Sequence, residues 1–116
     1  MSADILIGNK VILKTSSVVF ETLYYELRDI IEDKKDFISS EIEEFIDAME
    51  IYKQGGCYFH IDKYITTSKG VSELLNLLEQ AIMQLKNQFP QGVVSSLMVF
   101  SQDLKQYGDD LAKQGK

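Results

Sequence analysis

The residues best suited to chemistry gather in one short stretch, CYFHIDKY, at positions 57 to 64. Cys57 and His60 could act as a thiol and its base. In a strand, however, their odd separation directs the two side chains to opposite faces. We therefore interpret Cys57 as a small buried hydrophobe and expect no catalytic pair here.

His60 is also separated from Asp62 by two positions, so in an extended strand both share a face with Tyr58 and Tyr64. An imidazole oriented by a carboxylate beside two phenols could serve as a general base or as a row of binding groups. A metal site needs about three or four ligands, and the chain has one His and one Cys. We expect no metal, no cofactor and no catalytic residue, which leaves partner contact or a solvated strand face.

The composition bounds the class of protein. The chain has 116 residues, 45% of them hydrophobic and 26% charged, which is typical of a single globular domain over residues 1 to 116. No apolar run approaches the roughly 18 residues that span a membrane, and the first ten residues lack the pattern of a signal peptide. A single cysteine cannot form an internal disulfide, so we expect a cytoplasmic protein without membrane contact.

Negative charge is concentrated in residues 21 to 50. This segment contains eleven acids and three bases, a net charge of −8, which leaves +2 for the rest of a chain whose total is −6. An acidic surface repels phosphate backbones, so we expect no direct nucleic-acid binding. It also attracts basic proteins and speeds their association in a salt-sensitive way, so a basic protein partner is expected.

The order of elements predicts an α+β fold, in which an N-terminal β-hairpin and one further strand pack with about four helices. DILIGNKVILK predicts strands at about 3 to 7 and 10 to 15, joined by a type II′ turn at Gly8-Asn9. The expected faces of this hairpin are Ile5, Ile7 and Ile12 on one side, and Leu6, Val11 and Leu13 on the other. Alternation over residues 57 to 67 predicts the third strand, with Cys57, Phe59 and Ile61 on one face.

Apolar residues at helical spacing predict the first two helices. The first spans about residues 17 to 33, after an N-cap at Ser16-Ser17. The second begins with a capping box of Ser40 and Glu43 and runs until Gly55-Gly56 ends it.

Two further apolar stripes predict the third and fourth helices. The stripe over residues 71 to 89 ends before Pro90. Residues 93 to 111 begin with strand-like composition but keep a 4-3-4-3-4 spacing of apolar residues, so we favour a helix that Gly108 could break or end. Both stripes are most simply core, although either could form the seam of a dimer.

The acids of the first two helices fall on the side away from their apolar stripes. Tyr25 stands among the carboxylates of this outward side, as an aromatic anchor of an interface would. Glu41 falls at the margin of the second helix's outward face. The residues expected to bind a partner are Glu21, Tyr25, Asp29, Glu32, Glu43, Glu44, Asp47, Glu50, Tyr58, His60 and Tyr64.

Two stretches, ETLYYELRDIIED and SSEIEEFIDAME, carry a resemblance to a known class of protein. A small acidic domain with its charge on one side and no catalytic signature is similar to the immunity proteins of bacterial toxin systems. The resemblance implies a protein that binds a cognate toxin domain, often a nuclease, and places Asp and Glu against its basic groove. Two alternatives remain: an adaptor or oligomerising subunit that pairs through the 71–89 or 93–111 stripe, and a small enzyme or ligand-binding domain built on His60 and Asp62.

Overall fold

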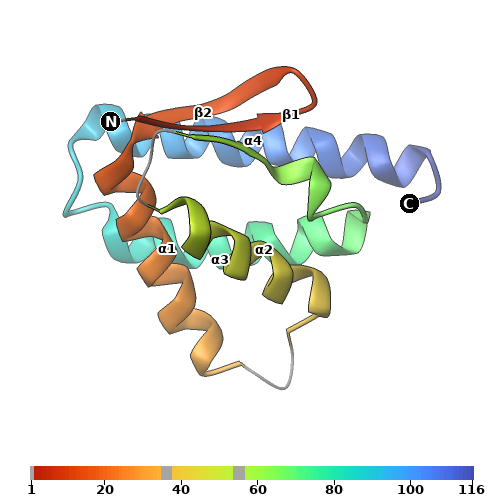
Figure 1. Ribbon diagram of the computed structural model, residues 1–116, viewed down its shortest axis with the longest axis horizontal. Coiled ribbons are helices and arrows are strands. Elements are labelled where there is room, and N and C mark those ends of the chain that lie inside the picture. Colours follow the sequence, from red (N-terminus) through yellow and green to blue (C-terminus); the bar gives the residue numbers. More distant parts are fainter. Residues whose placement is uncertain (1, 35–37, 54–56) are drawn as a thin grey trace.

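The computed structural model describes residues 2–34, 38–53 and 57–116. In these ranges the chain forms a three-stranded sheet and four α-helices, which confirms the α+β fold expected from the sequence (Figure 1). The expected helix end at Gly55-Gly56 lies outside the described residues. The elements are β1 (Ser2–Ile7), β2 (Lys10–Ser16), α1 (Ser17–Glu32), α2 (Ser40–Tyr52), β3 (Cys57–His60), the 3₁₀ turn η2 (Ile61–Lys63), α3 (Ser68–Leu85) and α4 (Gln91–Lys113).

The sheet has the order β2-β1-β3, so β1 is the central strand. It pairs antiparallel with β2 through the expected two-residue turn at Gly8-Asn9 and parallel with β3. Gly8 has a φ of 58°, a left-handed value that a type II′ turn requires at this position and that glycine adopts without a steric penalty.

The predicted face of Leu13 is wrong, because β2 contains a bulge. Ile5 pairs with Leu13 and Leu6 with Val11, so Ile12 is an extra residue opposite β1. Ile12 and Leu13 are consecutive in sequence, yet both are buried together with Ile5. The bulge allows β2 to contribute two neighbouring apolar residues to the same face.

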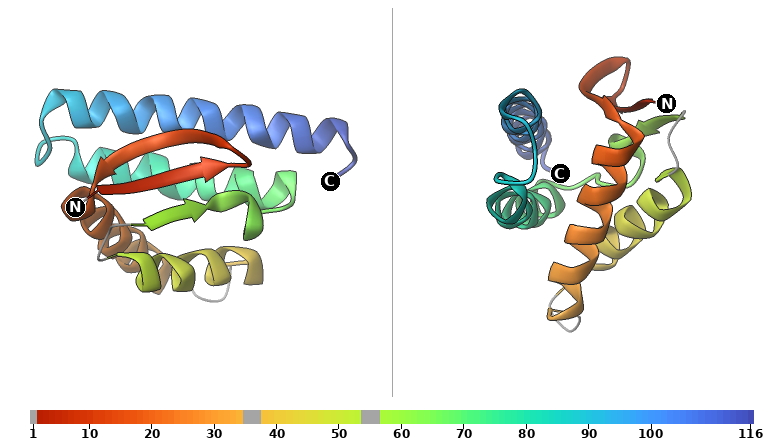
Figure 2. Two further views of the ribbon diagram at one scale, coloured as in Figure 1. Left: turned by 45° about the horizontal axis from the view of Figure 1, so that its top comes forward. Right: turned by 90° about the vertical axis from the view of Figure 1, so that its left-hand side faces the viewer.

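One face of the sheet packs on helices and the other is open. Ala3, Ile5 and Phe59 on the inner face are fully buried or nearly so. Figure 2, left, shows the outer face with no helix in front of it. The strand registers place Asp4 on that face between Lys14 of β2 and Tyr58 of β3.

The first two helices begin at serine caps. At α1, the Ser16 hydroxyl accepts a hydrogen bond from the Val19 backbone N–H, which confirms the expected cap. At α2, the cap is Ser39, whose hydroxyl accepts from the Ile42 N–H. The predicted capping box of Ser40 and Glu43 is therefore wrong by one residue.

The last two helices form an antiparallel hairpin on one side of the molecule. The helix α4 continues unbroken through Gly108, so the predicted weak point does not end it. A Cβ atom at Gly108 would lie 2.7 Å from Cγ1 of Val71 on α3, closer than packed atoms normally approach. The glycine is thus the residue that allows α3 and α4 to pack closely at this point.

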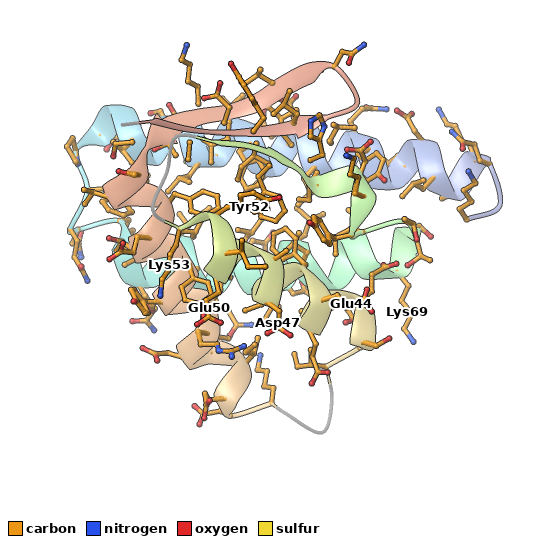
Figure 3. The ribbon with its side chains drawn as sticks, viewed as in Figure 1. Glu44, Asp47, Glu50, Tyr52, Lys53 and Lys69 are labelled. Carbon is orange, nitrogen blue, oxygen red and sulfur yellow. The ribbon has the colours of Figure 1, made fainter. Side chains whose placement is uncertain are left out.

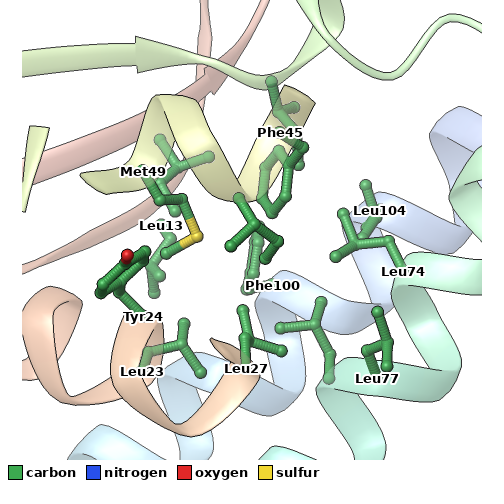
Figure 4. Close-up of a cluster of buried hydrophobic side chains, with 14 of the residues drawn as sticks. Leu13, Leu23, Tyr24, Leu27, Phe45, Met49, Leu74, Leu77, Phe100 and Leu104 are labelled. Atoms are coloured by element: carbon green, nitrogen blue, oxygen red, sulfur yellow. The ribbon is translucent and has the colours of Figure 1, made fainter. Parts of the chain in front are cut away.

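The core lies where all four helices and the inner face of the sheet meet (Figure 4). Its larger members include Leu13, Leu23, Leu27, Phe45, Met49, Leu74, Leu77, Phe100 and Leu104. None of the helices in the described part of the chain is long and apolar enough to cross a lipid bilayer.

Candidate protein-binding surface

The helices α1 and α2 pack against each other, and each carries exposed acidic side chains. We define the acidic surface as the seven carboxylates and one tyrosine that the sequence predicted on these helices. All eight side chains are exposed: Glu21, Tyr25, Asp29, Glu32, Glu43, Glu44, Asp47 and Glu50. Figure 3 shows Glu44, Asp47 and Glu50 in a row along α2.

A groove of about 260 Å³ lies between the two helices within the acidic surface. Its lining includes the carboxylates of Glu32, Glu43 and Asp47. Arg28 of α1 also lines the groove, and its Nη1 lies 3.4 Å from Oδ1 of Asp47. Both partners of this ion pair are well exposed, so it contributes little to stability. Arg28 partly neutralises the groove without filling it.

Tyr25 is held by a lysine that the sequence analysis did not connect with it. Lys53, just after α2, donates a 3.1 Å hydrogen bond from Nζ to the Tyr25 hydroxyl oxygen. The same ammonium lies 5.0 Å from the centre of the Tyr25 ring and 5.4 Å from that of Tyr24, both within cation–π range. The hydrogen bond to Tyr25 raises the pKa of Lys53. Tyr25 keeps 49% of its surface exposed, so it is a partly ordered ring rather than a free anchor.

Arg28 and Lys53 are the two functional candidates that reasoning from the sequence missed. The signal available was weak: each is a base placed within or directly after an acidic helix. Their partners lie 19 and 28 positions away, so only the packing of α1 on α2 identifies the pairs.

Glu41 does not belong to the acidic surface, which corrects its expected position at the margin of the outward face. Its carboxylate accepts hydrogen bonds from the Thr66 N–H, the Thr66 hydroxyl and the Thr67 hydroxyl, at 3.1, 3.0 and 2.8 Å. These bonds tie the beginning of α2 to the segment that leads into α3. Glu41 therefore has a structural role.

The predicted row of Tyr58, His60, Asp62 and Tyr64 does not form. The strand β3 ends at His60, and the chain then enters the 3₁₀ turn η2. Tyr58 is exposed and His60 half-buried on the open sheet face. Tyr64 instead packs edge-on against Phe59, with ring centres 5.3 Å apart, on the core side. Because Tyr64 packs on the core side, we no longer count it among the residues expected to contact a partner.

His60 and Asp62 are separated by the same change of backbone. Asp62 lines a hollow with Thr66, Thr67 and Tyr107, whereas His60 belongs to the sheet. The expected arrangement, in which Asp62 orients His60 as a base on one face of a continuous strand, is therefore not formed. In the described ranges, no three His, Cys, Asp or Glu side chains are grouped so that they could hold a metal ion.

The two apolar stripes are occupied within the domain. Leu97 and Leu104 of α4 are 1% and 0% exposed, and Leu74 and Leu78 of α3 are equally buried. A dimer seam along these stripes would require the domain to open. The residues on which the adaptor alternative was based are therefore not accessible to a partner in the folded domain.

No protein-family model matches the chain, and comparisons with curated proteins and with solved structures also found no match.

Proposed function

We propose that this protein is a non-catalytic inhibitor that binds a basic protein partner through the acidic surface and neutralises it. The observation that carries the proposal is the exposure of seven carboxylates on two packed helices, where Arg28 pairs with Asp47 and Lys53 contacts Tyr25. Concentrating like charge costs stability through self-repulsion, and a need for solubility alone is met by dispersed charge. Binding of a basic partner would explain why the chain tolerates this loss of stability.

The surface offers two kinds of contact to such a partner. The carboxylates of Glu43, Glu44 and Asp47 can pair with Lys or Arg, and close charge pairs at interfaces couple by about 1.5 to 7 kcal/mol. The exposed half of the Tyr25 ring adds apolar area beside them. Charges at the rim act mainly on the association rate.

The kind of partner follows from the resemblance to immunity proteins. A toxin nuclease presents a basic groove to its nucleic acid, and an acidic helix pair would cover that groove and exclude the substrate. We propose such a toxin domain as the partner and the cytoplasm as the compartment in which the two meet.

The test is a charge reversal on the acidic surface, measured by titration calorimetry against the basic partner recovered by co-purification. Glu44→Lys with Asp47→Lys should weaken binding by about tenfold or more and flatten its dependence on salt. Asp109→Lys with Asp110→Lys makes the same change in net charge at the far end of α4 and should alter affinity much less. Unchanged affinity and salt dependence in the first variant would contradict the proposal.

A further inference from the structure

An apolar groove of about 560 Å³ lies between α3 and α4, away from the acidic surface. Ile82 and Met83 of α3 line it together with Val94 and Met98 of α4. Met83 and Met98 are 64% and 54% exposed. Single exposed apolar side chains are ordinary, but here two flexible methionines share one depression with two further apolar residues.

The charges beside this groove have a self-complementary arrangement. Glu79 of α3 and Lys86, the C-cap residue that continues the helical backbone of α3, both line it, four residues before and three residues after Met83. These spacings place all three on one face of the helix. A two-fold axis near Met83 would set Glu79 of each copy against Lys86 of the other, and Met83 against its own counterpart. The groove contributes one acid and one base, so joining two copies brings no excess of like charge together.

We propose that a second copy of this chain occupies the groove, forming a symmetric dimer in which the α3–α4 layers face each other. Figure 2, right, shows α2 on the opposite side of the molecule from α4. The acidic surfaces of the two copies therefore point away from each other, and both stay free. The dimer is independent of the proposed function, because neither surface uses residues of the other.

The experiment is sedimentation equilibrium of the full chain over a wide range of concentration. The mean mass should rise from the 13.2 kDa of the monomer towards twice that value. Met83→Glu places two carboxylates near the two-fold axis and should weaken dimerisation by about tenfold or more. Ile51→Glu introduces the same group at a side chain that is 77% exposed on α2, and should leave dimerisation unchanged.

A charge swap tests the predicted pairing directly. Glu79→Lys alone should weaken the dimer, and Glu79→Lys combined with Lys86→Glu should restore it, because the exchanged pair forms again across the axis. Circular dichroism confirms that each variant folds, which is expected because the changed side chains are exposed. A chain that stays monomeric at every concentration, a dimer that survives Met83→Glu, or a swap that restores nothing would each overturn the proposal.

Discussion

Glu41 and Thr67 connect the beginnings of α2 and α3, two helices separated by β3 in the chain. The Thr67 hydroxyl donates a 2.8 Å hydrogen bond to Glu41 Oε1 and at the same time accepts a 3.0 Å bond from the Gly70 N–H. The carboxylate thereby orients the hydroxyl that caps α3. Gly70 leaves room for this contact, since a Cβ atom there would overlap the Glu41 carboxylate.

Loss of the Glu41 carboxylate should destabilise the fold. Glu41→Ala removes three accepted hydrogen bonds and leaves the α3 cap without its orienting partner, so we expect the free energy of unfolding to fall by about 1 to 2 kcal/mol. Urea denaturation measures the change. Glu44→Ala, one turn further along α2 and exposed, is the matched control and should change stability by less than about 0.5 kcal/mol. Equal effects in the two variants would contradict a structural role for Glu41.

Gly108→Ala should destabilise the protein although it improves helix propensity. The added methyl group meets Val71, which is buried and β-branched and so has no room to move away. Overpacking of this kind costs about 1 to 3 kcal/mol, more than the roughly 1 kcal/mol that alanine gains over glycine in a helix.

Gly92→Ala is the control for Gly108→Ala, because it lies in the first turn of the same helix with nothing within 4 Å of the new methyl group. It should stabilise by up to about 1 kcal/mol. The double variant Val71→Ala with Gly108→Ala should regain part of the stability that Gly108→Ala loses, because the smaller side chain at position 71 makes room for the new methyl group. Thermal unfolding of the three variants tests this, and a stabilised Gly108→Ala variant would show that α3 and α4 can move apart.

Removal of the internal cations should strengthen binding of a basic partner. Arg28→Gln frees Asp47, and Lys53→Gln frees the Tyr25 hydroxyl, so each change makes the acidic surface more negative. We expect the combined variant to bind the partner several-fold more tightly, with a steeper dependence on salt. The fold should lose no more than about 1 kcal/mol of stability from the exposed ion pair.

Lys69→Gln at the start of α3 makes a charge change outside the acidic surface and is the control for that measurement. Weaker binding by the Arg28 variant would place Arg28 itself in contact with the partner. That result would shift the binding surface away from the groove carboxylates.

Stability should decline at alkaline pH through three phenols that are buried or half-buried in the folded chain. Burial raises the pKa of Tyr107, and the nearby carboxylates of Asp62 and Glu41 raise it further. Burial also raises the pKa of Tyr24 and Tyr64. Below about pH 10 the phenols are protonated in both folded and unfolded chains. As the pH rises above that value the unfolded chain releases its protons first, so the free energy of unfolding falls.

Tyr107→Phe tests the contribution of Tyr107 to this decline. The variant loses the 2.7 Å hydrogen bond that the hydroxyl donates to the Ile65 carbonyl, so it should be less stable by about 1 kcal/mol at pH 8. Its stability should nevertheless fall less steeply than that of the natural protein between about pH 9 and 11. Tyr58→Phe, a change on the open sheet face, is the control for loss of a phenol. Parallel curves for the natural protein and Tyr107→Phe would contradict the prediction.

Periodicity was sufficient to locate the helices, because each has one apolar side that must be buried. The spacing over 93 to 111 and most of the stripe over 71 to 89 correspond to buried helix faces. The end of the second of these was predicted wrongly, because α3 stops at Leu85 and Phe89 lies beyond it. The hairpin was located for a similar reason, since Gly8-Asn9 separates two apolar strands. These sequence patterns are local, and they predict the structure correctly when the tertiary packing favours the same local conformation.

The predictions that were wrong concern residues for which the local sequence allows two conformations. At these residues, contacts with distant parts of the chain select one of the two. Ser39 and Ser40 are chemically equal as caps, and the backbone entering α2 selects Ser39. Both faces of the hairpin are apolar, so alternation cannot reveal a bulge at Ile12. Tyr64 turns inward because Phe59 offers a ring to pack against. The exposure of the acids was predictable from the helical wheel, whereas the pairing of Arg28 and Lys53 depends on how α1 crosses α2.

The central position of β1 sets an order for folding. Its pairing with β2 is local and can form within about 1 to 10 μs, the time of a hairpin. Its pairing with β3 joins Ala3 to Cys57 and must close a loop that contains both α1 and α2, at a larger cost in chain entropy. We expect that closure to be slow, so that the two acidic helices reach their final relation only when the third strand docks. The acidic surface would then form at the rate of the last folding step rather than at that of the first.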